Sequence, residues 1–320
     1  MMTPVRIPFT KMHGLGNDFV MLSGPIVNGV ELHPDHHLER LRQLAIFLCD
    51  RHFGVGADGL ILPAPPTHPD KGELRFVYIN SDGSVAEMCG NGIRCFALYV
   101  KEAGLIHSDA FTVETPAGPI RPRINADQTV TVDMGAPFLA AEQVPFKDGG
   151  IDPDKTALRH AIRVNDTAIP VTAIGMGNPH CLIFQEDLPQ KLDPALFGPL
   201  LETHPTFPAK TNVEFIETIS RQHLKVTVWE RGCGFTLACG TGACATAVAA
   251  MLLDKVDNTV NVELPGGILK IEWSGKPNDS VMMSGPATRV FEGEIELPSE
   301  LVNETTSGLN ESLLPSQAGV

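Results

Sequence analysis

Two short motifs in this sequence pair a cysteine with glycines at the start of a segment expected to be helical. They are Cys89-Gly-Asn-Gly92 and Cys239-Gly-Thr-Gly242. The first N–H groups of a helix lack partners within the helix and carry the positive end of its dipole. Such a start binds a carboxylate and favours the thiolate of a neighbouring cysteine, whose ordinary pKa is about 8.5. Glycine lets a ligand approach the backbone closely.

Two thiols on opposite faces of one carbon atom suit the inversion of a stereocentre. One removes a proton and the other returns a proton to the opposite face. Because the carbon acid is very weak, positioning and charge stabilisation must supply most of the acceleration. The sequence contains no phosphate-binding loop, no metal-spaced His and Cys cluster and no dinucleotide-binding glycine motif. We therefore expect an enzyme without metal or organic cofactor, with Cys89 and Cys239 as its acid/base pair.

The two motifs belong to an internal repeat. Four segments recur in the same order, and Gly135 and Gly285 each lie 46 positions after their cysteine. The matching pairs are Gly14–Asn17 with Gly175–Asn178, Cys89–Gly92 with Cys239–Gly242, Val113–Gly118 with Val262–Gly267, and Asp133–Pro137 with Met283–Ala287. We infer a tandem duplication, with one copy near 10–137 and the other near 171–288.

Each copy is expected to be a mixed α/β domain. Segments 74–79 and 224–229 have the composition of strands. Segments 93–100 and 243–253 are apolar around most of their circumference, as in a helix wrapped by a sheet. The expected fold class is α/β (mixed α+β), with two pseudo-symmetric domains, each a mixed sheet around a central helix, and the active site in the cleft between them.

The expected domain boundaries follow from the repeat. Residues 1–135, joined by a C-terminal strand at 286–297, form the first half, and residues 136–285 form the second. Within the second half, 138–170 is expected to be a connector with an irregular start. Residues 298–320 are polar and are expected to be a disordered tail.

Composition limits the partners and the location. The net charge of −14 argues against a nucleic-acid partner, and no segment approaches the 18 apolar residues of a membrane helix. The seven cysteines are expected to be free thiols in a reducing compartment. We expect a cytoplasmic enzyme with a small-molecule substrate.

Taken together, the motifs resemble those of diaminopimelate epimerases, over nearly the whole span from residue 7 to 297. The segments that carry the resemblance are Lys11–Phe19, Asn80–Ser84, Met88–Cys95, Gly177–Cys181, Thr211–Val213, Trp229–Gly234 and Ala238–Gly242. The resemblance implies interconversion of LL- and meso-2,6-diaminopimelate on the route to lysine. It also implies a reaction without pyridoxal phosphate and, as is frequent in the family, a homodimer.

The resemblance assigns a role to each matching residue. Cys89 and Cys239 transfer the proton, and His180 and Glu230 tune the thiols. The α-carboxylate is held by Gly90, Asn91, Gly240 and Thr241, and the rest of the substrate by Asn17, Asn80, Asn178, Asn212, Glu230 and Arg231. One departure is that some family members have a substrate-contacting Gln where this chain has Gly59.

The residues themselves support part of this assignment. Asn17 and Asn178 occupy equivalent repeat positions, and Asn80 and Glu230 each lie nine residues before their cysteine. The fork of Arg231 suits a distal carboxylate, although a surface ion pair is the plain alternative. A buried structural role is an equal alternative for His180. The remaining thiols are expected to be inert, and the histidines near Pro34 to lie in a solvated loop: Cys49, Cys95, Cys181, Cys233 and Cys244, and His33, His36 and His37.

Two other functions fit the paired thiols. A proline racemase or hydroxyproline epimerase has the same logic, but its cyclic substrate has no distal charged group for Glu230 and Arg231 to bind. A non-catalytic binding module or redox sensor would instead join Cys89 and Cys239 in a reversible disulfide.

Overall fold

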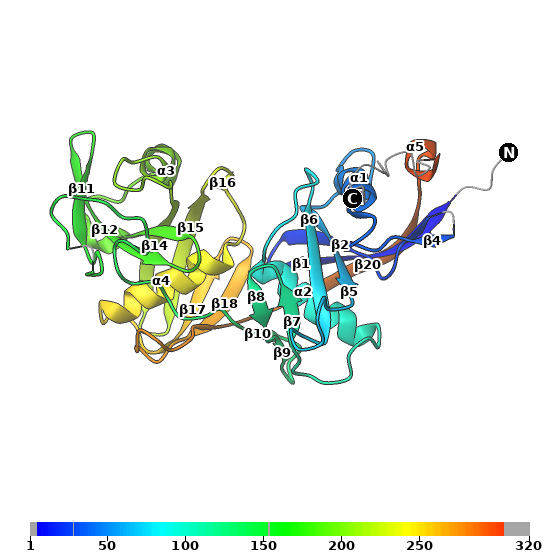
Figure 1. Ribbon diagram of the computed structural model, residues 1–320. Coiled ribbons are helices and arrows are strands. Elements are labelled where there is room, and N and C mark those ends of the chain that lie inside the picture. Colours follow the sequence, from blue (N-terminus) through cyan, green and yellow to red (C-terminus); the bar gives the residue numbers. More distant parts are fainter. Residues whose placement is uncertain (1–4, 28, 153, 304–320) are drawn as a thin grey trace, which may run out of the picture.

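The computed structural model describes residues 5–27, 29–152 and 154–303, which form two halves lying side by side (Figure 1). The first half contains helices α1 (Leu38–Cys49) and α2 (Gly90–Glu102). Its strands are β1 (Arg6–Gly14), β2 (Asn17–Met21), β3 (Ile26–Val27), β4 (Val30–Glu31), β5 (Gly59–Ala64), β6 (Leu74–Asn80), β7 (Val113–Thr115), β8 (Gly118–Ile120), β9 (Arg123–Ile124) and β10 (Val130–Asp133).

The second half contains helices α3 (Pro194–Glu202) and α4 (Gly240–Leu252) and the short 3₁₀ helix η1 (Gln185–Asp187). Its strands are β11 (His160–Val164), β12 (Thr167–Gly175), β13 (Pro179–Phe184), β14 (Asn212–Ser220), β15 (His223–Glu230), β16 (Gly234–Phe235), β17 (Thr259–Leu264), β18 (Gly267–Glu272) and β19 (Met282–Gly285). The chain continues into β20 (Thr288–Glu296) and α5 (Ser299–Asn303).

The two halves have the same sheet topology, as the repeat predicts. The order β1-β2-β5-β6-β7-β8 in one half corresponds to β12-β13-β14-β15-β17-β18 in the other. The sense of pairing also agrees at every step, since β2 with β5 and β13 with β14 are parallel, as are β6 with β7 and β15 with β17. The expected α/β fold with two duplicated domains is confirmed.

A buried helix forms the centre of each half. Every residue from Asn91 to Leu98 in α2 and from Gly242 to Ala250 in α4 is buried. Separate apolar clusters surround the two helices, and α1 and α3 pack on further clusters of their own half. The helices are longer at their N-termini than predicted, so the Gly-x-Gly parts of both motifs lie inside the first helical turn.

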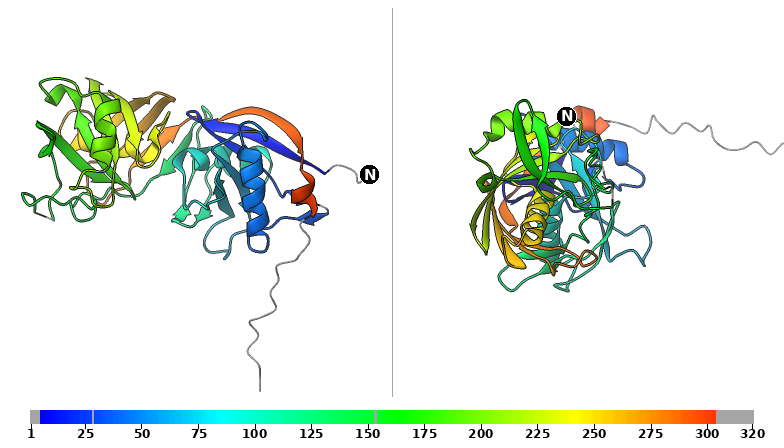
Figure 2. Two further views of the ribbon diagram at one scale, coloured as in Figure 1. Left: turned by 90° about the horizontal axis from the view of Figure 1, so that it is seen from above. Right: turned by 90° about the vertical axis from the view of Figure 1, so that its left-hand side faces the viewer.

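Two strand pairings join the halves. β10 pairs antiparallel with β19, with Val130 opposite Gly285 and Asp133 opposite Met282. β20 runs back along β1 from Arg6 to His13, as the orange and blue strands of Figure 2 show. β20 spans residues 288–296, and the sequence analysis expected a C-terminal strand at 286–297. The segment 138–170 begins irregularly, but it ends in β11, which forms a hairpin with β12.

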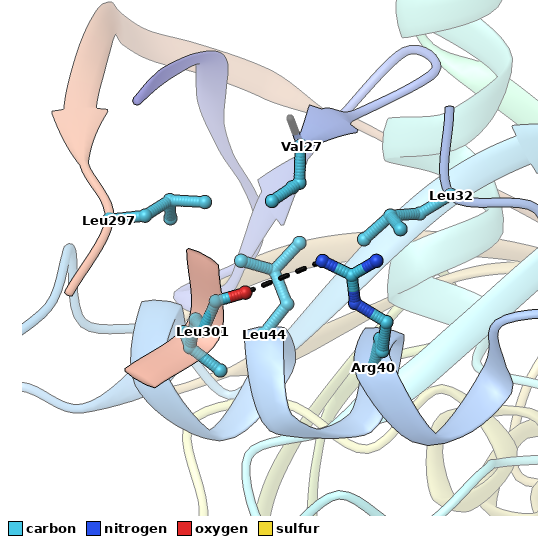
Figure 3. A pocket seen from close by; sticks show the side chains of 6 residues that line it. All are labelled: Val27, Leu32, Arg40, Leu44, Leu297 and Leu301. Atoms are coloured by element: carbon cyan, nitrogen blue, oxygen red, sulfur yellow. Dashed lines mark hydrogen bonds between the residues drawn. The ribbon is translucent and has the colours of Figure 1, made fainter. Parts of the chain in front are cut away.

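The end of the described chain corrects one expectation. Residues 299–303 form α5, where the sequence predicted disorder, and the expected tail beyond residue 303 lies outside the described residues. The contacts of α5 are with the first half. Figure 3 shows Leu301 of α5 and the preceding Leu297 lining a small pocket together with Val27, Leu32 and Leu44. Arg40 of α1 also donates to the carbonyl oxygen of Leu301 at 3.4 Å.

Candidate active site

Each predicted catalytic cysteine caps the N-terminus of its central helix. Cys89 Sγ accepts from the amide of Gly92 at 3.4 Å, and Cys239 Sγ accepts from the amide of Gly242 at 3.3 Å. Both cysteines have extended backbones, as N-cap residues normally do. A side chain at position 242 would clash, because its Cβ would lie 2.6 Å from Glu214 Oε1. Glycine at this position is therefore required by close packing.

The two helix starts meet where the halves join. A Cβ atom on Gly240 would lie 3.9 Å from the Cα atom of Gly90. Asn91 Nδ2 donates at 3.3 Å to the carbonyl oxygen of Ala238, the residue before Cys239. The side chain of Met283 packs against both glycines. The structure thus brings together the two motifs, which lie 150 residues apart in the sequence.

The surroundings raise the pKa of both thiols. Burial raises the pKa of Cys89, although the amides of Gly92 and Asn91 and the charge of Arg94 oppose it. Burial also raises the pKa of Cys239, well above its ordinary value, and the carboxylates of Glu230 and Glu214 add to the rise. The helix start lowers each thiol pKa in the predicted sense, but desolvation by burial raises it by more.

Beside Cys239, His180 forms a buried pair with Glu214, an acid that the sequence analysis did not select. His180 Nδ1 and Glu214 Oε1 are 2.7 Å apart, and neither side chain is exposed. The parallel pairing of β13 and β14 places them together. Leu182 of β13 lies opposite Glu214 of β14, and His180 lies two residues before Leu182, on the same face of the sheet. Glu214 Oε2 has no hydrogen-bond partner among the described residues. One signal could have revealed this acid: it is the only charged residue in the apolar run 213–216.

Glu230 links this pair to the thiol. It ends β15, as predicted, and accepts a hydrogen bond from Thr236 Oγ1. Burial raises the pKa of its carboxyl group, an effect that Glu214 strengthens and that hydrogen bonds from Thr236 and Cys239, together with His180, oppose. His180 Nε2 lies 2.9 Å from Asn178 Oδ1. His180 therefore contacts the predicted site through Asn178 and Glu214, without a direct bond to either thiol among the described interactions.

Asn212 and Arg231 are adjacent in space. Asn212 Oδ1 accepts from the backbone amide of Arg231 at 2.9 Å, and its Nδ2 donates to the carbonyl oxygen of Pro179 at 3.3 Å. The Arg231 side chain is exposed and donates to the carbonyl oxygen of Ala209 at 3.0 Å. Among the described residues it has no carboxylate partner, which leaves its fork available to an anionic ligand.

Asn17 lies on the first-half side of the site. Its Oδ1 is 3.6 Å from Cys89 Sγ and 3.3 Å from Asn91 Nδ2. Its Nδ2 donates to Asp58 Oδ2 at 2.6 Å, and Asp58 is in turn ion-paired with Arg51 at 2.9 Å. Asp58, which sequence reasoning did not select, thereby fixes the orientation of the Asn17 amide.

Asn80 and Gly59 are opposite each other on paired strands. Asn80 ends β6, and its side-chain amide donates to Ser84 Oγ at 2.9 Å within the following turn. A Cβ atom on Gly59 would lie 2.3 Å from the ring of Tyr78 and 2.7 Å from the carbonyl oxygen of Ile79. Tyr78 occupies the space that a longer side chain at position 59 would need.

The remaining cysteines are separate from this chemistry. Burial raises the pKa of Cys49, Cys95 and Cys244 to about 12 and that of Cys181 well above its ordinary value. Cys233 is exposed. All seven thiols are free. Within residues 5–27, 29–152 and 154–303, no cluster of His, Cys, Asp and Glu is arranged to hold a metal ion, and no helix is long and apolar enough to span a membrane.

Solved structures share the fold at low sequence identity. A probable proline racemase from Agrobacterium radiobacter K84 is 17% identical with a TM-score of 0.62, covering 91% of this chain and 93% of its own. A hydroxyproline epimerase from Agrobacterium vitis is 15% identical with a TM-score of 0.61, covering 91% of this chain and 93% of its own.

Sequence relatives are much closer. The diaminopimelate epimerase of Heliobacterium modesticaldum is 47% identical over 294 residues, which cover 90% of this chain and 99% of the relative. The diaminopimelate epimerase of Desulforudis audaxviator is 49% identical over 294 residues, which cover 89% of this chain and 98% of the relative. The family model for diaminopimelate epimerase matches residues 9–139 and 172–290, in agreement with the two copies of the repeat. This protein belongs to the diaminopimelate epimerase family.

Proposed function

We propose that this protein interconverts LL- and meso-2,6-diaminopimelate, with Cys89 and Cys239 as the two-base pair. The observation that carries the proposal is the meeting of two cysteine-capped helix starts, so close that a Cβ atom on Gly240 would lie 3.9 Å from Gly90 Cα. The close relatives, which are diaminopimelate epimerases, support the substrate.

The reaction begins when one cysteine, as thiolate, removes the proton from the α-carbon. The electron pair moves toward the α-carboxylate, and the opposite thiol then donates its proton to the other face of the carbon. Backbone amides at the two helix starts, around Gly90, Asn91, Gly240 and Thr241, hold the carboxylate and stabilise the added negative charge. One thiol has gained a proton and the other has lost one, so the reverse reaction uses the same pair in exchanged roles.

The second stereocentre gives the substrate a distal amino-acid group. Arg231 would bind its carboxylate, and Asn178, Asn212 and Glu230 would provide polar groups for its ammonium end. Asn17 contacts Cys89 and Asn91, so it would line the reacting end, and Asn80 would line the same side from the end of β6. Through Asn178 and Glu214, His180 would set the electrostatics near Cys239.

Incubation with LL-diaminopimelate in deuterium oxide tests the proposal directly. We expect the meso isomer with one solvent deuterium at a single α-carbon, measured by mass spectrometry and chiral chromatography. Proline and 4-hydroxyproline are the control substrates, and turnover of these in place of diaminopimelate would refute the assignment.

We also propose that the protein is a cytoplasmic homodimer. Seven free thiols fit a reducing compartment. Val290 and Phe291 are exposed on β20, which is an edge strand of its sheet, and such apolar edges favour pairing between copies. Light scattering coupled to gel filtration would measure the mass, and a monomer at micromolar concentration would contradict the dimer.

A further inference from the structure

Arg94 is a buried guanidinium at the junction between the two cysteine turns. Among the described residues, it is the largest side chain with no exposed surface. Nη1 donates to the carbonyl oxygen of Gly90 at 2.9 Å, and Nη2 donates to Asn91 Oδ1 at 2.8 Å. Nε donates to the carbonyl oxygen of Pro286 at 3.1 Å, which lies on the chain returning from the second half.

The fork of Arg94 determines which way the Asn91 amide faces. A guanidinium can only donate hydrogen bonds, so the side-chain oxygen of Asn91 must be the atom that faces it. The Asn91 nitrogen then points away, where it donates to Ala238 and to Asn17 Oδ1, each at 3.3 Å. Asn91 therefore bridges the two turns, and Arg94 holds the bridge in the correct orientation.

The surroundings are shaped to admit this one side chain. A Cβ on Gly14 would lie 3.0 Å from Arg94 Nη2, and a Cβ on Gly285 would lie 3.4 Å from Nε. At the equivalent position of the repeat, α4 carries the small residue Cys244, five residues after its own cysteine. The duplicated halves thus differ here: one supplies the fork, and the other leaves room for it.

The charge of Arg94 has no acidic partner among the described residues, although isolated buried charges are costly. Burial lowers the pKa of this guanidinium. Its hydrogen-bond partners are neutral: the carbonyl oxygens of Gly90 and Pro286 and the side-chain oxygen of Asn91. Because none of them neutralises the guanidinium, an anion bound at the helix starts would be attracted by its positive charge. A substrate carboxylate would supply that anion.

We propose that Arg94 is a positioning residue that sets the relative placement of the two thiols through Asn91. The inference rests on the proposed two-thiol reaction. If Arg94 is replaced, the thiol that removes the proton still reaches the carbon, whereas the opposite thiol is displaced. The captured proton then exchanges with solvent and a deuteron returns to the same face, so substrate is labelled without being inverted.

The test compares labelling with inversion in deuterium oxide. For wild type, Arg94→Lys and Arg94→Met, we measure deuterium in recovered LL-diaminopimelate and formation of the meso isomer at early times. We expect the ratio of labelled substrate to product to rise at least about tenfold in both variants, since misplacement by about 1 Å costs about a hundredfold in rate. Lysine keeps the charge but not the fork, so it should not restore the ratio.

Two further variants make the outcome decisive. Cys244→Ala alters the equivalent position of α4 and should keep the wild-type ratio. Asn91→Asp preserves the acceptor for Arg94 but removes the donor to Ala238, so it should raise the ratio even if the Arg94 variants fail to fold. An unchanged ratio in folded Arg94 variants, or in Asn91→Asp, overturns the inference. If wild type neither labels nor inverts the substrate, the proposed function itself has failed.

Discussion

The Glu214 carboxylate is 2.7 Å from His180 Nδ1, and both side chains are fully buried beside the turn of Cys239. Its negative charge is one of the causes that raise the pKa of Cys239, after burial and Glu230. The charge of Glu214 therefore disfavours the thiolate at Cys239.

Replacing Glu214 by Gln should lower the pKa of the Cys239 thiol. The change removes one negative charge, while the amide oxygen can still accept from His180. The thiolate absorbance of Cys239, titrated in a Cys89→Ser background, measures the shift. Glu217→Gln, on the same strand but only half-buried and paired with Lys191, is the control and should leave the titration in place. A rise in the pKa would show that Glu214 does not act through its charge.

Cys89 should ionise at a lower pH than Cys239. Burial raises both pKa values, and that of Cys239 rises well above its ordinary value because Glu230 and Glu214 add more to it than Thr241 and the Gly242 amide remove. At Cys89 the amides and Arg94 oppose the rise, and Glu230 is its smallest cause. Because the reaction needs one thiolate and one thiol, kcat/KM should be bell-shaped in pH. Its rising limb belongs mainly to Cys89 and lies in the alkaline range, and the falling limb belongs mainly to Cys239. Ultraviolet titration of Cys239→Ser and Cys89→Ser checks this order, which the reverse sequence of ionisation would contradict.

Substitution of either proposed catalytic cysteine by Ala should lower kcat by about a hundred- to ten-thousand-fold, the usual contribution of a general acid or base. Cys233→Ala is the matched control, because Cys233 is exposed and lies in the same part of the second half. Circular dichroism establishes that the variants are folded. Meso product formed by Cys89→Ala or Cys239→Ala at a rate near that of wild type would refute the two-base assignment.

Arg231→Ala should raise KM for diaminopimelate by about 10- to 100-fold, because a charge-assisted hydrogen bond contributes about 1.5–3 kcal/mol. The effect on kcat should be smaller, since the distal carboxylate is remote from the reacting carbon. Arg289→Ala, which removes an exposed arginine on β20, is the control and should leave KM unchanged. Equal KM values for Arg231→Ala and wild type would remove Arg231 from the binding site.

Gly59→Gln should destabilise the fold by about 1–3 kcal/mol, as overpacking usually does. The new side chain would meet Tyr78 and the backbone of Ile79, both closer than real contacts allow. Gly149→Gln is the control, because nothing lies within 4 Å of a Cβ there. Urea denaturation measures both. If Gly59→Gln is as stable as wild type, Tyr78 can move aside, and the position can accept the Gln of other family members.

The fold could be predicted from the sequence because matching glycine and cysteine positions reveal the internal repeat. These positions keep the same order and nearly the same spacing in both copies, and the apolar patterns of helices and strands lie between them. The duplicated architecture and the two cysteine motifs could therefore be predicted from one comparison. Glu214 and Arg94 were missed for a common reason. Each is a charged residue within an apolar stretch, 213–216 for Glu214 and 93–100 for Arg94, and its partners come from distant segments that only sheet pairing and helix contact bring near.

The balance of forces on the thiols was also beyond the sequence. A helix start predicts the sign of its own contribution to a cysteine pKa, but not the degree of burial that opposes it. Burial depends on how two halves, formed by residues far apart in the chain, close over Cys89 and Cys239.

The return of β20 to β1 has a consequence for synthesis of the protein. Arg6 of β1 lies opposite Glu296 of β20. The outer edge of β1 therefore stays without its pairing strand until β20 has been synthesised. On the ribosome, the amino-terminal lobe cannot reach its finished form while the carboxyl-terminal lobe is still being made. A nascent chain released before residue 288 would contain both cysteines, but β1 would lack the strand that pairs with its outer edge. Folding of the first half therefore requires translation to continue through β20.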